Sequence, residues 1–375
     1  MNIQYRRKDY INLFSNTVFG INFTNWMRLL ARNKFSIPPA FWLKAIFITV
    51  NSLFFAPVYF LERLLYRNRI NKTKVVRPIF ILGHHRSGTT YLHNLLSRDP
   101  NLAFCSTYQA LVPNQFLLGG GVFRRILGKF MPATRPQDNV KSGAEMPIEE
   151  EFAMGNMCGV SFTHSYYFPQ SIRQVFDDVV TFETATPALM DEWKTNFDYL
   201  LKKLSFKNKG KRLVLKSPSN TGRMKELLTL YPDAVFIHIH RDPNVVYLSN
   251  VNLYEKILPI LSFQKADNKE IDDFIFYSYR KIHEKFLADK KSTPTSKLVE
   301  ISFNDLVADP IGLLERIYRH LSIEGFNQAA PHFREEIKDA VGYKTNSYKS
   351  PDPATKKRIA EEWGFMFDAY GYPKD

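Results

Sequence analysis

The segment of this sequence best suited to chemistry contains two glycines with four residues between them. The segment from Gly83 to Thr90 reads Gly-His-His-Arg-Ser-Gly-Thr-Thr, between a short apolar run and a helix-like one. Glycines at this spacing allow a tight turn, so that N–H groups at the next helix N-terminus converge on an anion. Ser87, Thr89 and Thr90 add hydroxyl donors. The segment predicts a phosphate-binding loop, and the alternative is an ordinary strand-to-helix turn.

The position of the cation in this loop restricts the ligand. In nucleoside triphosphatase loops a lysine follows the second glycine and reaches the β and γ phosphates. Here Thr89 follows Gly88, and the cation is Arg86, whose planar fork can hold one phosphate or sulfate in a bidentate manner. This pattern argues against ATP hydrolysis and favours a ligand with a single 5′ phosphate that carries another group.

Two further cations follow apolar runs that are typical of buried strands. Lys216 ends one run, and Arg241 ends another, with Ser249 two helical turns later. In open α/β sheets ligands bind outside the carboxyl ends of the strands, so we expect Arg86, Lys216 and Arg241 along one edge. The alternatives are a solvated lysine at a turn and a surface pair of Arg241 with Asp242.

The sequence resembles the PAPS-dependent sulfotransferases, whose donor is 3′-phosphoadenosine 5′-phosphosulfate (PAPS), from about Arg77 to Leu321. It is most similar to the bacterial lipid and steroid sulfotransferase-like branch with the loop Pro-Arg-Ser-Gly-Thr-Thr, although His85 replaces the proline. The matching residues are Arg86, Ser87, Gly88, Thr89, Thr90, Leu92, His93, Asn94, Leu95, Leu96, Asp99 and Pro100.

The resemblance implies a set of donor contacts. PAPS would be the co-substrate, bound by Arg86, Ser87, Gly88, Thr89 and Thr90, with Arg241 and Ser249 at its 3′ phosphate. A tyrosine-containing segment near the C-terminus would close over the nucleotide, and residues 344–349 with Tyr348 are its expected counterpart.

The expected reaction needs a base and no metal. An acceptor oxygen attacks sulfur in line, while Arg86 and Lys216 stabilise the charge of the leaving bisphosphate. The cytosolic small-molecule branch has a histidine base two residues after a strand-end lysine, but Pro218 holds that position here. The candidates are Glu149, Glu150 and Glu151, with Glu150 first, because they resemble an acidic segment of the bacterial branch where a carboxylate acts. The alternative is an acidic first helical turn favoured by the helix dipole.

Alternating strands and helices predict an α/β fold with a P-loop-like central parallel sheet flanked by helices. We expect a helical, partly apolar N-terminal region over 1–76, a sulfotransferase domain over 77–325, and a C-terminal helical tail over 326–375. The expected strands are Ile79–Leu82, Leu213–Leu215, Ala234–Ile239 and Leu298–Ile301. The expected helices are Thr90–Ser97, Phe152–Met157, Arg223–Leu230, Val245–Asn250 and Ile311–Leu321.

Composition adds limits on partners and location. The net charge of +14 attracts phosphates, anionic lipids or nucleic acid without choosing among them. Cys105 and Cys158 are too few for a disulfide framework or zinc site, and His238 and His240 are expected to be strand histidines, with no metal bound. The N-terminus lacks the order of a secretory signal, so we expect a cytoplasmic protein.

The apolar segment 41–61 is flanked on both sides by basic residues and interrupted by Lys44, Asn51, Ser52 and Pro57. This pattern favours peripheral contact with a membrane over a spanning helix. A pair of core or cap helices is the alternative.

Aromatic residues at 108–118 and 160–169 indicate a pocket for a sterol, a steroid or a lipid alcohol, with a carbohydrate acceptor as the alternative. We expect no nucleic acid partner. Two other classes of protein stay open. A P-loop kinase would need a lysine after Gly88, and a basic membrane-binding module would use the charge without needing Arg86.

Overall fold

The computed structural model describes residues 1–13, 16–121, 124, 125, 128, 134, 141–340 and 350–374. Tyr348, expected to close over the nucleotide, lies outside the described residues. The chain divides into two compact units. The first contains Met1–Val75, Cys105–Gly210 and Leu253–Ile271, and the second contains Val76–Phe104, Lys211–Asn252 and Asp272–Asp375.

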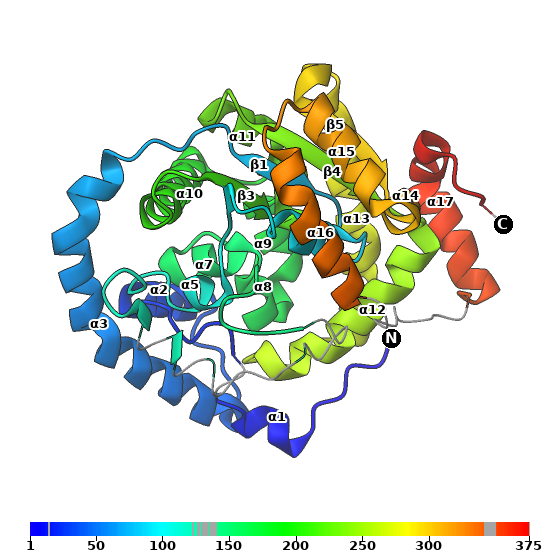
Figure 1. Cartoon of the computed structure of the whole chain (residues 1–375). Coiled ribbons are helices and arrows are strands. Elements are labelled where there is room, and N and C mark those ends of the chain that lie inside the picture. The colour runs from blue at the N-terminus through cyan, green and yellow to red at the C-terminus, as the bar shows by residue number, and fades with distance from the viewer. Residues whose placement is uncertain are drawn as a thin grey trace. The chain divides into compact units, whose positions relative to one another are not determined.

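The second unit is built on a five-stranded sheet in which all described pairs are parallel (Figure 1). The strand order is β2-β3-β1-β4-β5, so β1 lies at the centre. The strands are β1 (Ile79–Leu82), β2 (Leu102–Ala103), β3 (Arg212–Lys216), β4 (Val235–His240) and β5 (Leu298–Ser302). The predicted parallel sheet is therefore confirmed, and the short β2 at its edge is an addition to it.

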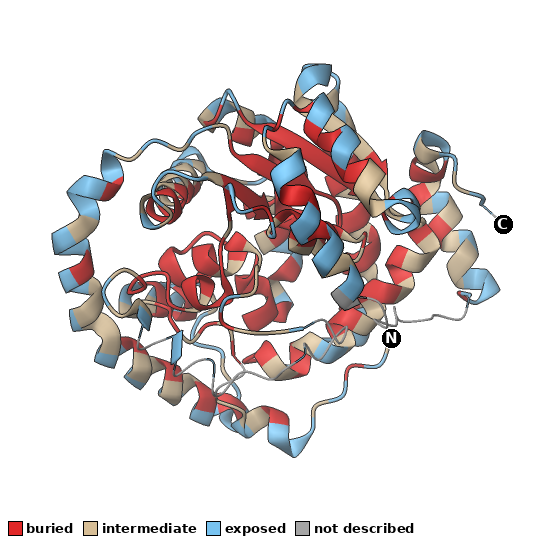
Figure 2. Ribbon diagram, in the orientation of Figure 1, coloured by how far each residue is buried: buried red, intermediate tan, exposed pale blue. Residues whose placement is uncertain are grey.

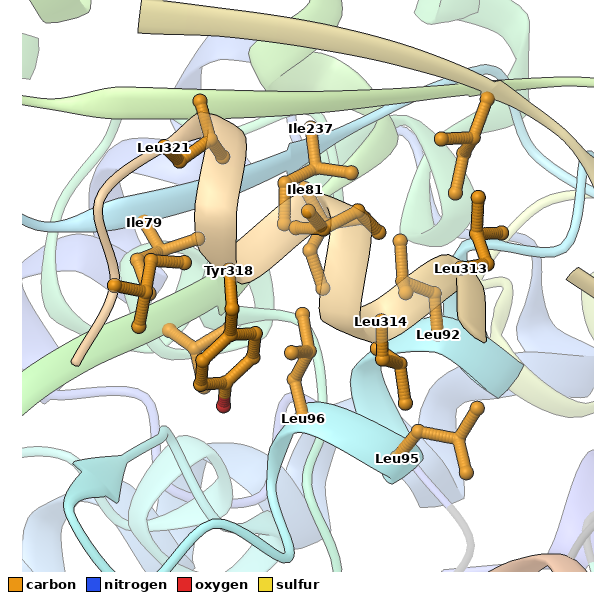
Figure 3. Close-up of a cluster of buried hydrophobic side chains, with 14 of the residues drawn as sticks. Ile79, Ile81, Leu92, Leu95, Leu96, Ile237, Leu313, Leu314, Tyr318 and Leu321 are labelled. Carbon is orange, nitrogen blue, oxygen red and sulfur yellow. The ribbon is translucent and has the colours of Figure 1, made fainter. Parts of the chain in front are cut away.

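Both faces of the central strands are buried, which explains their nearly continuous apolar sequences (Figure 2). Alternate residues point to opposite faces. On one face, Ile79, Ile81 and Ile237 pack against leucines of α4 (Thr89–Leu96) and α15 (Pro310–His320) (Figure 3). On the other face, His238 stacks on Phe286 of α13 (Asn268–Lys290), with ring centroids 4.0 Å apart.

Helices lie between the strands of this sheet along the chain, and two of them contain residues of both units. α12 begins in the second unit and ends in the first, and α13 begins in the first. The helices are α4 (Thr89–Leu96), η3 (Pro218–Arg223), α11 (Met224–Leu230), α12 (Pro243–Leu261), α13 (Asn268–Lys290), η4 (Thr295–Lys297), α14 (Phe303–Ala308), α15 (Pro310–His320), α16 (Phe326–Ala340) and α17 (Pro353–Tyr370).

The first unit is helical in its described elements, and its longest helix is α3. The apolar segment near the N-terminus forms this one helix, which continues through Pro57, and not the pair of helices considered as an alternative. The elements are α1 (Arg7–Ile11), α2 (Phe23–Arg32), η1 (Pro39–Phe41), α3 (Trp42–Asn71), α5 (Thr107–Leu111), α7 (Glu150–Met157), α8 (His164–Tyr167), η2 (Pro169–Ser171), α9 (Ile172–Val179) and α10 (Pro187–Lys207).

Candidate active site

The loop between β1 and α4 requires both of its glycines. Gly83 has φ +141° and Gly88 has φ +104°, a region that side chains with a Cβ rarely occupy. A Cβ at Gly83 would lie 2.5 Å from the carbonyl oxygen of Ile239, and one at Gly88 would lie 2.3 Å from Cδ2 of Phe303. The backbone can therefore turn into the N-terminus of α4 only with glycine at these two positions.

Arg86 lies at the tip of this loop with φ +72° and is half-buried. Its Nε donates a hydrogen bond to Oγ of Ser249 over 2.8 Å. Nδ2 of Asn250 donates to the carbonyl oxygen of His85 over 3.1 Å. The first half of α12 thus braces the loop, and it joins Arg86 to Ser249, two residues predicted at opposite ends of the donor.

Lys216 is the last residue of β3 and is almost fully buried. Its Nζ donates to Oγ1 of Thr90, the second residue of α4, over 3.4 Å. Lys216 pairs in register with Ile81 of β1, one residue before the strand ends. The lysine is therefore at the carboxyl edge of the sheet beside the loop helix, and not at a solvated turn.

Arg241 follows β4 directly and stacks on Phe303, with its guanidinium carbon 4.3 Å from the ring centroid. Phe303 begins α14 directly after β5. The same ring lies against Gly88. Sequence reasoning missed Phe303 as a supporting residue, although an aromatic residue at the end of a fourth strand was a usable signal.

Thr221 is a second residue that sequence reasoning missed. Its Oγ1 accepts a hydrogen bond from the backbone nitrogen of Gly83 over 2.7 Å. It lies in η3, whose residues are all buried. The short distance in sequence from Lys216 was the available signal, because a loop after one strand end meets the loop after its neighbour.

Hydroxyl groups of the loop differ in their roles. Ser87 donates from Oγ to the carbonyl oxygen of His84 over 2.8 Å, so its hydroxyl closes the turn itself. Thr89 is buried at the first position of α4, and Thr90 is half-buried and bonded to Lys216. The predicted phosphate loop is thus a rigid turn that leads into a helix N-terminus.

Two histidines beside this edge of the sheet, His84 and His240, are packed and uncharged near neutral pH. His84 is buried between Tyr279 and His283, with ring centroids 5.1 Å and 5.9 Å away. Burial, with a smaller contribution from His85, lowers the pKa of His84 to about 3. His240 lies under the ring of Tyr370 at 3.7 Å, and burial lowers its pKa to about 4. These rings support the loop and the strand ends without adding charge.

The three glutamates lie in the first unit, around the start of α7. Glu151 accepts hydrogen bonds from Oγ of Ser161 at 2.9 Å and the backbone nitrogen of Phe162 at 2.8 Å. Glu150 is completely buried, and its charge adds to the effect of burial that raises the pKa of Cys105. Glu149 precedes the helix and is half-buried. The cluster therefore contains three distinct environments.

His164 is buried in the same unit. Its Nε2 lies 3.0 Å from the carbonyl oxygen of Gly155. Burial lowers the pKa of His164 to about 4. The histidine is thus a neutral, hydrogen-bonded core residue.

The residues at the sheet edge can hold an anion with two separated phosphate groups. Three cations follow three adjacent parallel strands, β3, β1 and β4. The loop amides and the N-terminus of α4 favour negative charge in the same place. Arginine and lysine are the side chains that recognise phosphate and sulfate oxygens in proteins.

Comparison with known families agrees with this arrangement. Residues 78–328 match the model of the sulfotransferase family. The chain belongs to the sulfotransferase family. It is therefore a sulfotransferase, and the kinase and binding-module alternatives are set aside.

Named sulfotransferases align with almost the whole length of this chain. The omega-hydroxy-beta-dihydromenaquinone-9 sulfotransferases Stf3 of Mycobacterium bovis and Mycobacterium tuberculosis are each 31% identical over 95% of this chain and 91% of their own length. The crystal structure of sulfotransferase STF1 from Mycobacterium tuberculosis has a TM-score of 0.65 at 18% identity, covering 92% of this chain and 94% of that one. Sulfotransferase STF9 from Mycobacterium avium has a TM-score of 0.63 at 17% identity, covering 94% and 97%. The two crystal structures share the fold.

Proposed function

We propose that this sulfotransferase moves the sulfuryl group of PAPS to a hydroxyl of a lipophilic acceptor, such as a sterol, a steroid or a lipid alcohol. The observation that carries the proposal is the set of cations around the rigid loop. Arg86, Lys216 and Arg241 follow three adjacent strands, and glycine is required on both sides of the loop.

Two groups of residues at the carboxyl edge of the sheet would bind the two phosphate positions of the donor. Arg86, with the amides of Gly88, Thr89 and Thr90, suits the 5′ phosphosulfate, because these groups surround the N-terminus of α4. Ser87, predicted as a further contact, donates from its amide to the carbonyl oxygen of His84 over 3.2 Å and so shapes the turn that holds them. Arg241 and Ser249 suit the 3′ phosphate. Phe303 holds the guanidinium of Arg241 by stacking, which limits its freedom before the donor binds.

Transfer proceeds by one substitution at sulfur in this proposal. The acceptor oxygen forms a bond to sulfur, and the bond from sulfur to the bridging phosphate oxygen breaks. That oxygen leaves with the electron pair, and Arg86 and Lys216 stabilise its charge. The acceptor's proton passes to a carboxylate. No metal takes part in these steps.

Glu150 is the proposed base among the three glutamates. Glu151 is committed to Ser161 and Phe162, where it holds the turn after α7. Glu149 is half-buried, whereas Glu150 is shielded completely from solvent. Glu150 is therefore preferred on its position, as the buried first residue of α7, whereas structural contacts hold Glu151.

A lipophilic acceptor is favoured by two observations. The Stf3 relatives are named for an omega-hydroxy dihydromenaquinone, which is a lipophilic alcohol. In the unit that contains Glu150, the aromatic side chains expected to form a pocket are buried together, and Phe162 packs edge-on against Tyr166 at 5.4 Å. A cytoplasmic location, with peripheral membrane contact through residues 1–76, is part of the proposal.

The acceptor class is tested by competition. The purified protein is incubated with PAPS and an equimolar pool of sterols, steroids, long-chain isoprenoid alcohols and sugars, and the products are analysed by mass spectrometry. The proposal predicts a gain of one sulfuryl group on a lipophilic alcohol. Sulfation of the sugars alone would contradict the acceptor class and leave the donor assignment standing.

A further inference from the structure

The helix α3 has an apolar face that is exposed along most of its length. Phe54 is 74% exposed and Phe60 is 68% exposed, and intervals of three and four residues place the exposed side chains on one face. This apolar face of α3 consists of Trp42, Leu43, Ile46, Val50, Leu53, Phe54, Phe60, Leu61, Leu64 and Leu65. At 1.5 Å per residue, the face extends over about 35 Å. An exposed apolar surface of this size marks a contact with another apolar phase or molecule.

The opposite face of α3 is buried and carries Lys44, Ser52 and Glu62 beside Ile48 and Ile70, so charged side chains lie on the protein side of this helix. Nζ of Lys44 donates to the carbonyl oxygens of Ile260 at 2.8 Å and Ser262 at 3.2 Å. Glu62 is 2% exposed and accepts from the backbone nitrogens of Leu117 at 2.7 Å and Leu118 at 2.9 Å. Both ends of the helix are therefore tied to the first unit.

A third buried contact completes this attachment and decides how α3 can meet a membrane. Lys203 of α10 forms a buried ion pair with Glu62. By length and composition α3 could cross a bilayer. Crossing, however, would pull Lys44 and Glu62 away from their partners into hydrocarbon, which is costly for ionisable groups. With one face bound to protein, the helix can only lie flat on a membrane.

The charge of the N-terminal region identifies the kind of membrane. Residues 1–76 contain twelve lysines and arginines and only two acidic residues, Asp9 and Glu62. Both acidic side chains are buried. The exposed basic residues before α3 in the sequence include Arg28, Arg32 and Lys34, and those in its C-terminal part or directly after it are Arg63, Arg67, Arg69, Lys72 and Lys74. Basic side chains beside an exposed apolar face complement the headgroups of anionic lipids.

We infer that the apolar face of α3 inserts in the plane of an anionic phospholipid bilayer and holds the enzyme on that surface. The inference deepens the membrane contact of the proposed function and does not depend on which acceptor is sulfated. A second copy of the chain is a weaker occupant, because two regions with this excess of basic residues would repel each other.

Vesicle binding of the full chain tests the inference. Val50, Phe54 and Leu61 are replaced together by glutamine, which leaves the Lys44 and Glu62 contacts in place. Co-sedimentation uses vesicles of phosphatidylcholine with roughly one third phosphatidylglycerol. We expect the triple variant to bind at least about tenfold more weakly than the wild type, because three apolar side chains no longer enter the membrane. Phosphatidylcholine vesicles should bind the wild type less than the anionic ones.

A single substitution at a comparable site provides the control. Phe54→Gln is compared with Val307→Gln, since Val307 is 55% exposed and belongs to α14 in the second unit. Val307→Gln should bind like the wild type. Equal binding by the wild type and the triple variant would overturn the inference. So would a wild-type dimer that the triple variant converts to monomers in light scattering, because the face would then pair two copies.

Activity in the absence of vesicles separates this inference from the proposed function. Sulfation of a short, water-soluble alcohol should be the same in the wild type and the triple variant. If neither protein sulfates any acceptor, the proposed function fails, and the vesicle result still decides the role of α3.

Discussion

Arg86 shows at the scale of a single residue how the loop is prepared for an anion. Its backbone adopts φ +72°, which costs about 1 kcal/mol or more for a residue other than glycine. The hydrogen bond to Ser249 compensates by holding the side chain toward α12. A side chain held in place before the donor binds loses less entropy on binding.

Replacing Arg86 by alanine removes this preorganised donor. We expect kcat/KM for sulfation to fall by about 10²- to 10³-fold, the usual effect of deleting a group that stabilises transition-state charge. The matched control is Arg319→Ala, because Arg319 is exposed on α15 and pairs only with Glu315 among its described contacts. Steady-state kinetics with PAPS measure both variants. Equal losses in the two variants would show a general charge effect.

The glutamates can be separated by substitution with glutamine. Glu150→Gln should lower kcat by about 10²- to 10⁴-fold while adenosine 3′,5′-bisphosphate binds as in the wild type, because only the proton acceptor is lost. Glu151→Gln should act mainly on stability, since Glu151 holds Ser161 and Phe162. Kinetics and thermal unfolding give the two readouts. If Glu151→Gln alone abolished turnover without lowering Tm, the assignment to Glu150 would be wrong.

At the scale of elements, the turn from β1 into α4 depends on Gly88. Gly88→Ala would place a Cβ 2.3 Å from the Phe303 ring and 3.2 Å from Cδ1 of Ile239, at φ +104°. We expect a loss of about 1–3 kcal/mol in the free energy of unfolding, together with weaker donor binding. Chemical denaturation measures the change.

Gly364 provides the matched control for Gly88. It lies inside α17, and a Cβ there meets nothing closer than Nζ of Lys374 at 4.0 Å. Gly364→Ala should leave stability unchanged or raise it slightly, because alanine is the better helix former. Similar losses for both substitutions would mean that the loop is not specially constrained.

The elements also show what the sequence could and could not predict. The strands β1, β3, β4 and β5 were predicted to within a residue or two. In β1, β3 and β4 two buried faces leave nearly continuous apolar runs, whereas the edge strand β5 is only partly buried and carries Glu300. The two-residue β2 carries too little pattern to detect. The helix α12 extends to Leu261, well beyond the predicted end at Asn250, and it continues through Pro259.

The candidate site was predictable where it depends on the order of strands and loops. Arg86, Lys216 and Arg241 each follow a recognisable strand, so a parallel sheet places them at one edge. The same argument places Phe303 and Thr221 near strand ends, but it does not give their roles, which arise from contacts with Gly88, Arg241 and Gly83 across the fold. The predicted limits of the three sequence regions remain predictions.

At the scale of the whole molecule, buried histidines link stability to pH. Burial lowers the pKa of His84, His93 and His283 to about 3, against an ordinary value of 6.5. Between these values the unfolded chain binds protons that the folded chain does not bind. Stability is therefore full above about pH 6.5 and falls as the pH decreases, by about 1.4 kcal/mol per pH unit for each histidine.

Unfolding measured from pH 7.5 down to pH 5 tests this linkage. The free energy of unfolding should decrease with falling pH, and His283→Gln should make that decrease shallower even if it lowers stability overall. A curve that is flat over this range, or a slope that the substitution leaves unchanged, would contradict the linkage.

The most direct test of the donor site is to compare adenosine 3′,5′-bisphosphate with adenosine 5′-monophosphate by calorimetry, for the wild type and for Arg241→Met. The two nucleotides differ only in the 3′ phosphate, which Arg241 and Ser249 are proposed to hold. We predict that the wild type binds the bisphosphate at least about tenfold more tightly, the effect of a charge-assisted contact of about 1.4 kcal/mol or more, and that Arg241→Met loses this preference. Equal binding of the two nucleotides by the wild type would contradict the assignment of this sheet edge to PAPS.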